Sequence, residues 1–106
     1  MASSGSANVL PLEGEIDLHV SPRVERSLAS IIAKRPQHVV VDLSGVTFID
    51  SSGLAVLIHA MQDVNEYGGK LTLSGINENV RVIFEMARLD QFFLIEPRDD
   101  ELLAAD

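Results

Sequence analysis

The chain has 106 residues, of which 46% are apolar and 23% are charged. This composition is typical of a globular domain, and the length leaves room for one domain only. Acidic residues outnumber basic ones by 16 to 8, and the resulting formal charge of −8 disfavours direct binding to nucleic acid. The chain has no cysteine, which excludes a disulfide scaffold, a thiolate metal site and a cysteine nucleophile.

The sequence contains no pattern of a targeting signal or a membrane span. No apolar run approaches the roughly 18 residues that a membrane span needs, and no charged-then-apolar leader opens the chain. We therefore expect a cytoplasmic protein without membrane insertion. Residues 1–8 are small and polar and predict a disordered or added tail, so the domain itself is expected over residues 9–106.

The first half of the chain alternates between strand and helix patterns. Residues 9–18 predict a strand that a proline and a glycine interrupt. Ser21 as the N-cap and Pro22 at the first helical position predict a helix that ends before Pro36. The run Val39–Val41 is β-branched and continuous, which is typical of a strand buried on both faces of a parallel sheet.

The second half of the chain repeats this alternation. Apolar residues recur at helical spacing over about residues 54–67, and a glycine pair follows them. Residues 71–76 predict a strand. Asn77 is expected to cap a third helix with a buried stripe of four residues, Val80, Ile83, Phe84 and Ala87.

Residues 92–95 predict a last short strand, and residues 99–105 predict a final helix. Strands that are joined through helices run parallel, and the crossover helices cover the sheet. We therefore expect a small α/β domain with a mostly parallel sheet of four to five strands and helices packed against it. Binding sites in such sheets form where strand ends meet helix starts, and the most unusual of these junctions is at residues 50–53.

The junction has the sequence Asp50-Ser51-Ser52-Gly53. These residue types are those of a helix N-cap, and any of the first three residues can fill that role. A phosphate on Ser51 would also meet free N–H groups and the positive end of the helix dipole. It would add about −1.5 to −2 charges and change the surface without melting the helix.

Three other chemical interpretations have weaker support. The tetrapeptide is not the Gly-x-Ser-x-Gly elbow of serine hydrolases, and His59 lies about two turns past Ser51, too far to serve as its base. The three histidines lie on separate elements, so we predict no metal and no cofactor. Asp42 and Asp50 suggest an Mg²⁺-dependent receiver-like domain, but Lys70 begins a strand where a receiver needs a lysine at a strand's end. We therefore expect a binding protein and not an enzyme.

Four blocks of the sequence, in the same order, resemble the pattern of a known family. They are LEGEID at residues 12–17, VVVDLSGVTFIDSSGL at residues 39–54, GGKL at residues 68–71 and FEMARLDQF at residues 84–92. Together they resemble the signature of STAS-domain proteins, the anti-sigma factor antagonists, over nearly the whole chain from Val9 onward. The tetrapeptide alone is weak evidence, whereas the four blocks together are specific.

The resemblance implies a bacterial partner-switching module that regulates transcription. In such families the unphosphorylated antagonist binds an anti-sigma factor, which is also a GHKL-type serine kinase, and thereby frees the sigma factor. The kinase phosphorylates the first serine of the motif, here Ser51, and binding ends until a PP2C-type phosphatase removes the phosphate. Partner contacts are expected at Ser51 and at the matching positions Asp17, Asp50, Ser52, Gly53 and Leu54.

The resemblance leaves a second function open. STAS domains also serve as subunits of bacterial lipid-transport ATPases or as parts of stressosome-type complexes, in which the same surface docks on another partner without a phospho-switch. The family usually has a further strand before the block at residues 12–17, and only eleven residues precede Leu12 here. That first strand is therefore expected to be short, missing or contributed otherwise, which leaves the oligomeric state open.

Overall fold

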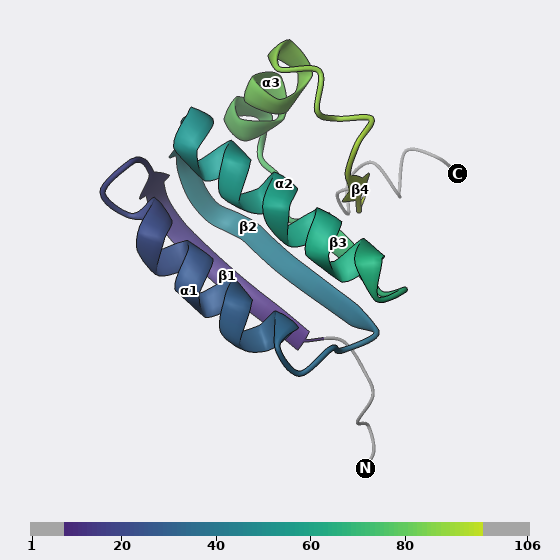
Figure 1. Ribbon diagram of the computed structural model, residues 1–106. Coiled ribbons are helices and arrows are strands. Elements are labelled where there is room, and N and C mark those ends of the chain that lie inside the picture. The colour runs from purple at the N-terminus through teal and green to yellow at the C-terminus, as the bar shows by residue number, and fades with distance from the viewer. Residues whose placement is uncertain (1–7, 97–106) are drawn as a thin grey trace.

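The structure is a computed structural model that describes residues 8–96, in which four strands form one parallel sheet accompanied by helices (Figure 1). The strand order is β1-β2-β3-β4, and every neighbouring pair is parallel, so the expected α/β class is confirmed. The helix predicted over residues 99–105 lies outside the described residues. The elements in chain order are β1 (Asn8–Ile16), α1 (Ser21–Ile32), β2 (His38–Ile49), α2 (Ser51–Glu66), β3 (Lys70–Ser74), α3 (Glu78–Met86) and β4 (Leu94–Ile95).

Strand β2 lies inside the sheet between β1 and β3. Its side chains alternate between the two faces: Val39 and Val41 belong to the main hydrophobic core and have no exposed surface, whereas Val40 points to the other face and is 8% exposed. Since both faces are covered along this stretch, the strand has a continuous apolar run instead of an alternating pattern. β2 then continues to Ile49 and carries the chain to the start of α2.

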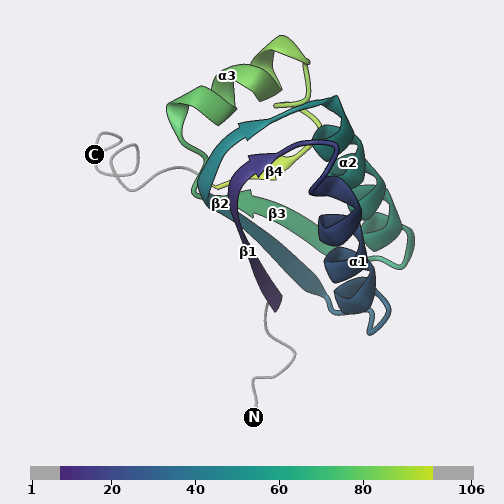
Figure 2. The same cartoon turned by 90° about the vertical axis from the view of Figure 1, so that its left-hand side faces the viewer.

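Helices α1 and α2 lie side by side on one face of the sheet, and α3 lies apart from them, near the end of β2 (Figure 2). Parallel strands are joined by right-handed crossovers, so two successive crossovers to adjacent strands place their helices on the same face. Leu28 of α1 and Leu57 of α2 are each 1% exposed in the core beneath them. Burial of one such side chain contributes roughly 1.5–3 kcal/mol to the free energy of unfolding.

None of the helices described over residues 8–96 has the length and apolar character of a membrane span.

The boundaries of α1 and α3 correct two of the predictions. The N-cap residue of α1 is Val20, so the prediction of Ser21 as the cap is wrong: Ser21 is the first helical residue and is only 5% exposed. Asn77 does cap α3, because its Oδ1 accepts the backbone N–H of Val80 at 3.0 Å. Ala87 follows the last residue of α3 and is exposed, so its predicted place in the buried stripe is wrong.

The last described segment closes the core with one of two adjacent phenylalanines. Phe93 is 5% exposed and packs edge-on against Phe84 of α3, with 5.7 Å between the ring centroids. Phe92 is 65% exposed. β4 then adds two residues, Leu94 and Ile95, to the edge of the sheet beside β3.

Candidate functional site

The candidate site lies where the ends of β1 and β2 meet the start of α2. The backbone N–H of Asp50 donates to the carbonyl oxygen of Ile16 at 3.2 Å, and this bond joins the two strand ends. The turn from β1 into α1 therefore lies next to the tetrapeptide at residues 50–53. This is the edge at which the carboxyl ends of parallel strands meet and at which sites form in such sheets.

Asp50 is the N-cap of α2. Its Oδ1 accepts the backbone N–H of Ser52 at 2.9 Å and that of Gly53 at 3.1 Å, and the backbone at Asp50 is extended, as an N-cap requires. The hydrogen bond from the Ser52 hydroxyl lowers the pKa of the Asp50 carboxyl, and the N–H groups of Gly53, Ser52 and Leu18 act in the same direction. Asp50 is therefore a stable anion beside Ser51 at neutral pH.

Ser51 is the first residue of α2, and its side chain is exposed. Within residues 8–96 its hydroxyl makes no hydrogen bond, so no internal contact is lost when another molecule reaches it. The backbone N–H groups of the first helical turn and the helix dipole make this end of α2 electropositive. Ser51 thus combines an accessible hydroxyl with an environment that tolerates added negative charge.

Ser52 points the other way, toward the start of α1. Its Oγ lies 2.6 Å from Asp50 Oδ1 and 2.8 Å from the Oγ of Ser21, which in turn lies 2.8 Å from the carbonyl oxygen of Asp17. Two hydroxyl hydrogens serve these three contacts. The Ser21 hydroxyl donates to the Asp17 carbonyl oxygen, and the Ser52 hydroxyl donates to the charged Asp50 carboxylate, so the two serine oxygens share the remaining contact.

This partly buried chain of hydroxyl groups joins the start of α1 to the start of α2. Sequence reasoning missed Ser21 as a member of the site, because it assigned that residue to a local helix cap. No signal along the sequence relates positions 21 and 52, since only the packing of the two crossovers brings them together.

Gly53 and Leu54 hold the start of α2 against the sheet. A Cβ atom at Gly53 would lie 2.7 Å from Cγ1 of Ile49 and 2.9 Å from the carbonyl oxygen of Ile16, so only glycine permits this approach. Leu54 is 8% exposed and packs in the core. Of the residues predicted to contact a partner, these two are therefore placed beneath the surface, and Ser51 lies on it.

Asp17 is brought to the same place by the turn between β1 and α1. Its Oδ1 accepts the backbone N–H groups of His19 at 3.0 Å and Val20 at 3.2 Å, which shapes the turn. Leu18, between them, is 71% exposed. The structure thus gathers Asp17, Asp50 and both serines of the tetrapeptide at one end of the sheet.

The other titratable residues in the described part of the chain form no metal site. His38 is used structurally, with its Nε2 2.7 Å from the hydroxyl oxygen of Thr72 on β3. Among residues 8–96 no group of three or more histidine or acidic side chains is placed to hold a metal ion.

The fold and the site define a small α/β domain with a parallel sheet and an accessible serine at a capped helix start. The STAS domain profile matches residues 1–102, and the chain belongs to this family. The anti-sigma F factor antagonist of Paenibacillus polymyxa is 31% identical over 97 residues, which are 91% of this chain and 81% of that protein.

Two solved structures are similar in fold. An anti-sigma factor antagonist from Mycobacterium paratuberculosis has a TM-score of 0.80 and 28% identity, over 99% of this chain and 88% of that one. The anti-sigma factor antagonist SpoIIAA in its unphosphorylated form has a TM-score of 0.69 and 17% identity, over 99% of this chain and 92% of that one. The second likeness concerns the fold alone.

Proposed function

We propose that the protein is an anti-sigma factor antagonist whose binding is switched by phosphorylation of Ser51. Membership of the STAS family and the similarity to the Paenibacillus polymyxa antagonist over most of both chains support the first part. The observation that carries the second part is the exposed Ser51 hydroxyl, free of internal hydrogen bonds among residues 8–96, at the start of a helix that Asp50 already caps.

In the unphosphorylated state the surface around Ser51 binds an anti-sigma factor, and the sigma factor is released in the cytoplasm. The anti-sigma factor is a GHKL-type serine kinase that phosphorylates Ser51, and a PP2C-type phosphatase reverses the modification. Asp17, Asp50 and Ser52 shape the contact surface. Gly53 and Leu54 contribute from below by fixing where the helix begins.

The local electrostatics explain how one phosphate would change binding and leave the fold intact. The phosphate meets the positive end of the helix dipole, and Asp50 keeps the capping hydrogen bonds. The modified surface then carries about −1.5 to −2 further charges beside the Asp50 carboxylate. A partner that covers this spot must desolvate two neighbouring anions, which costs several kcal/mol.

The site assignment can be tested with the purified chain, ATP and the anti-sigma kinase of its own genome. We expect intact mass spectrometry to show one phosphate on the wild type, and none on Ser51→Ala. Ser30→Ala, an exposed serine of α1, is the matched control and should be labelled fully.

Binding is measured on the same samples. The unphosphorylated chain should co-elute with the anti-sigma factor, and the phosphorylated chain should elute free. Full labelling of Ser51→Ala would overturn the site assignment. Recovery of an ATPase and a permease from the native cell, without a kinase, would favour the transport-complex alternative.

A further inference from the structure

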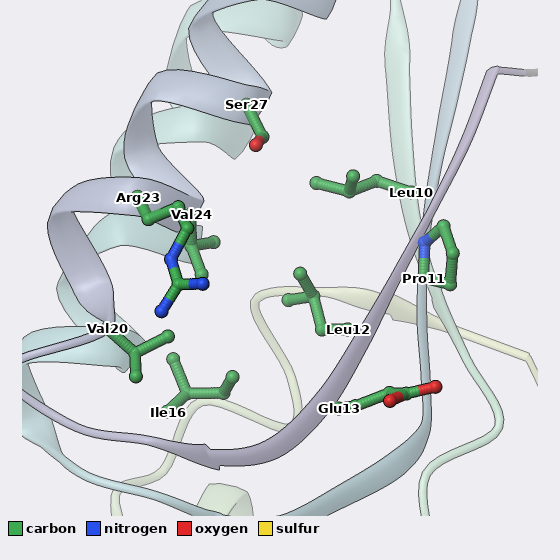
Figure 3. Close-up of a pocket in the computed structure, with 9 residues that line it drawn as sticks. All are labelled: Leu10, Pro11, Leu12, Glu13, Ile16, Val20, Arg23, Val24 and Ser27. Carbon is green, nitrogen blue, oxygen red and sulfur yellow. The ribbon is translucent and has the colours of Figure 1, made fainter.

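A groove of about 440 Å³ separates α1 from the edge strand β1, and Ser51 is not among the residues that line it (Figure 3). Figure 3 shows Leu10 and Leu12 of β1 pointing across it toward Val20 and Val24 of α1. The two leucines are only half-buried. The volume falls in the roughly 300–1,000 Å³ range of small-molecule sites.

The shape of the groove is elongated. Its β1 wall runs from Leu10 to Ile16, which at about 3.3 Å per residue is roughly 20 Å of strand. Its apolar lining comes from both elements, and its polar members are Glu13, Arg23 and Ser27. Such a groove suits a chain-like apolar group better than a compact one.

The groove contains one positive charge. Arg23 of α1 extends over the Ile16 and Val20 end of the groove (Figure 3). In residues 8–96 Arg23 has no acidic partner within salt-bridge distance. The Glu13 side chain points away from the groove in the same view, so no carboxylate of the lining competes for the guanidinium.

The edge of β1 is a poor surface for another strand. Pro11 lacks a backbone N–H, and two register shifts interrupt its pairing with β2, on either side of the Glu13–Gly14 segment. The exposed acids Glu13 and Glu15 add charge to this edge, and the same edge of a second copy would bring like charges together. These features argue against another β-strand, or a second copy of this chain, as the occupant of the groove.

We propose that the groove between β1 and α1 binds a free fatty acid. The carboxylate would accept a paired hydrogen bond from the planar Arg23 guanidinium, and the acyl chain would lie along Leu10, Leu12 and Val24. Charge complementarity selects a carboxylate head over a neutral one, and the apolar length of the groove selects a chain. Ser51 does not line the groove, although Ile16 at one end of the groove accepts the backbone N–H of Asp50.

The experiment uses the full chain and octanoate, followed by two-dimensional NMR. We expect saturable shifts of backbone signals in residues 10–16 and 20–27. Arg23→Gln should weaken octanoate binding at least about tenfold, the loss typical of one charge-assisted contact. Arg26→Gln, an exposed arginine of the same helix outside the groove, is the matched control and should bind like the wild type.

Two further arms separate the occupants. Octanol should bind at least about tenfold more weakly than octanoate, since it lacks the charge, and Ser27→Phe should block the groove without disturbing the core. Three results would each overturn the fatty acid site: octanol binds as tightly as octanoate, the two arginine variants lose affinity equally, or the shifts lie outside the groove. So would a concentration-dependent dimer, or binding only to phosphatidylglycerol vesicles.

Discussion

Two helices in the described part of this protein begin with a serine, and the two starts have opposite surroundings. Ser21 begins α1 after a residue that cannot cap, and it is buried, with its hydroxyl between Asp17 and Ser52. Ser51 begins α2 after the capping carboxylate of Asp50 and is exposed. One serine is a structural link between elements, and the other is free for chemistry.

The comparison teaches that the cap decides what a serine at a helix start is free to do. Asp50 satisfies the N–H groups of the first turn of α2, so the hydroxyl of Ser51 is not needed there. At α1 the Asp17 carboxylate shapes the turn from farther back, and Ser21 is drawn into the contact with α2. Substitutions at these contacts, one at a time, distinguish the residues that stabilise the fold from the serine that is free to react.

The largest effect is expected from Gly53→Ala. The new Cβ would lie closer than 3.0 Å to Ile49 and to the backbone of Ile16, so the start of α2 must move away from the sheet. Overpacking of this kind costs about 1–3 kcal/mol of unfolding free energy, measured by urea denaturation. Ala55→Ser, an exposed change in the next turn, should cost less than about 0.5 kcal/mol. Equal effects of the two variants would refute the close approach.

Variants of Asp50 separate its charge from its capping role. Asp50→Ala removes the cap of α2 and should destabilise the fold at neutral pH, whereas Asp50→Asn keeps an acceptor and should destabilise it less, as urea unfolding would measure.

The pH dependence of unfolding distinguishes the same two roles. Folding lowers the pKa of the Asp50 carboxyl below its unfolded value of about 3.9. The ionised carboxylate therefore stabilises the fold above that pH. This stabilisation is lost as the pH falls through the lower pKa of the folded state. The wild type should therefore lose more stability than either variant between about pH 6 and about pH 2. Parallel curves for all three proteins would contradict the shift.

The smallest effect tests the two serines against each other. Ser21→Ala removes the partly buried hydrogen bond to the Asp17 carbonyl and should cost about 0.5–1.5 kcal/mol. Ser51→Ala removes no internal contact among the described residues and should stay within about 0.5 kcal/mol of the wild type. Urea unfolding of both variants provides the measurement. A larger loss in Ser51→Ala than in Ser21→Ala would reverse the assignment of the two starts.

Most of the fold follows from local patterns. The β-branched run at Val39–Val41 indicated a strand covered on both faces, and the structure places it inside the sheet. The prediction that Asn77 caps α3 is confirmed. It could be made from the sequence because the capping hydrogen bond reaches only three residues along the chain. The prediction of Ser21 as a cap failed because Ser21 interacts with Ser52, on the next crossover.

The sequence by itself determined the alternation of strands and helices, the parallel sheet and the position of the tetrapeptide at a helix start. These depend on periodicity and on short-range hydrogen bonds, which are readable within a few residues. Only the tertiary structure decided that Ser51 is exposed while Ser52 meets Ser21 of α1, that Gly53 touches β1, and that a groove lies beneath Arg23. Each of these depends on contacts between segments far apart in the chain, because side-chain burial is set by the packing of whole elements.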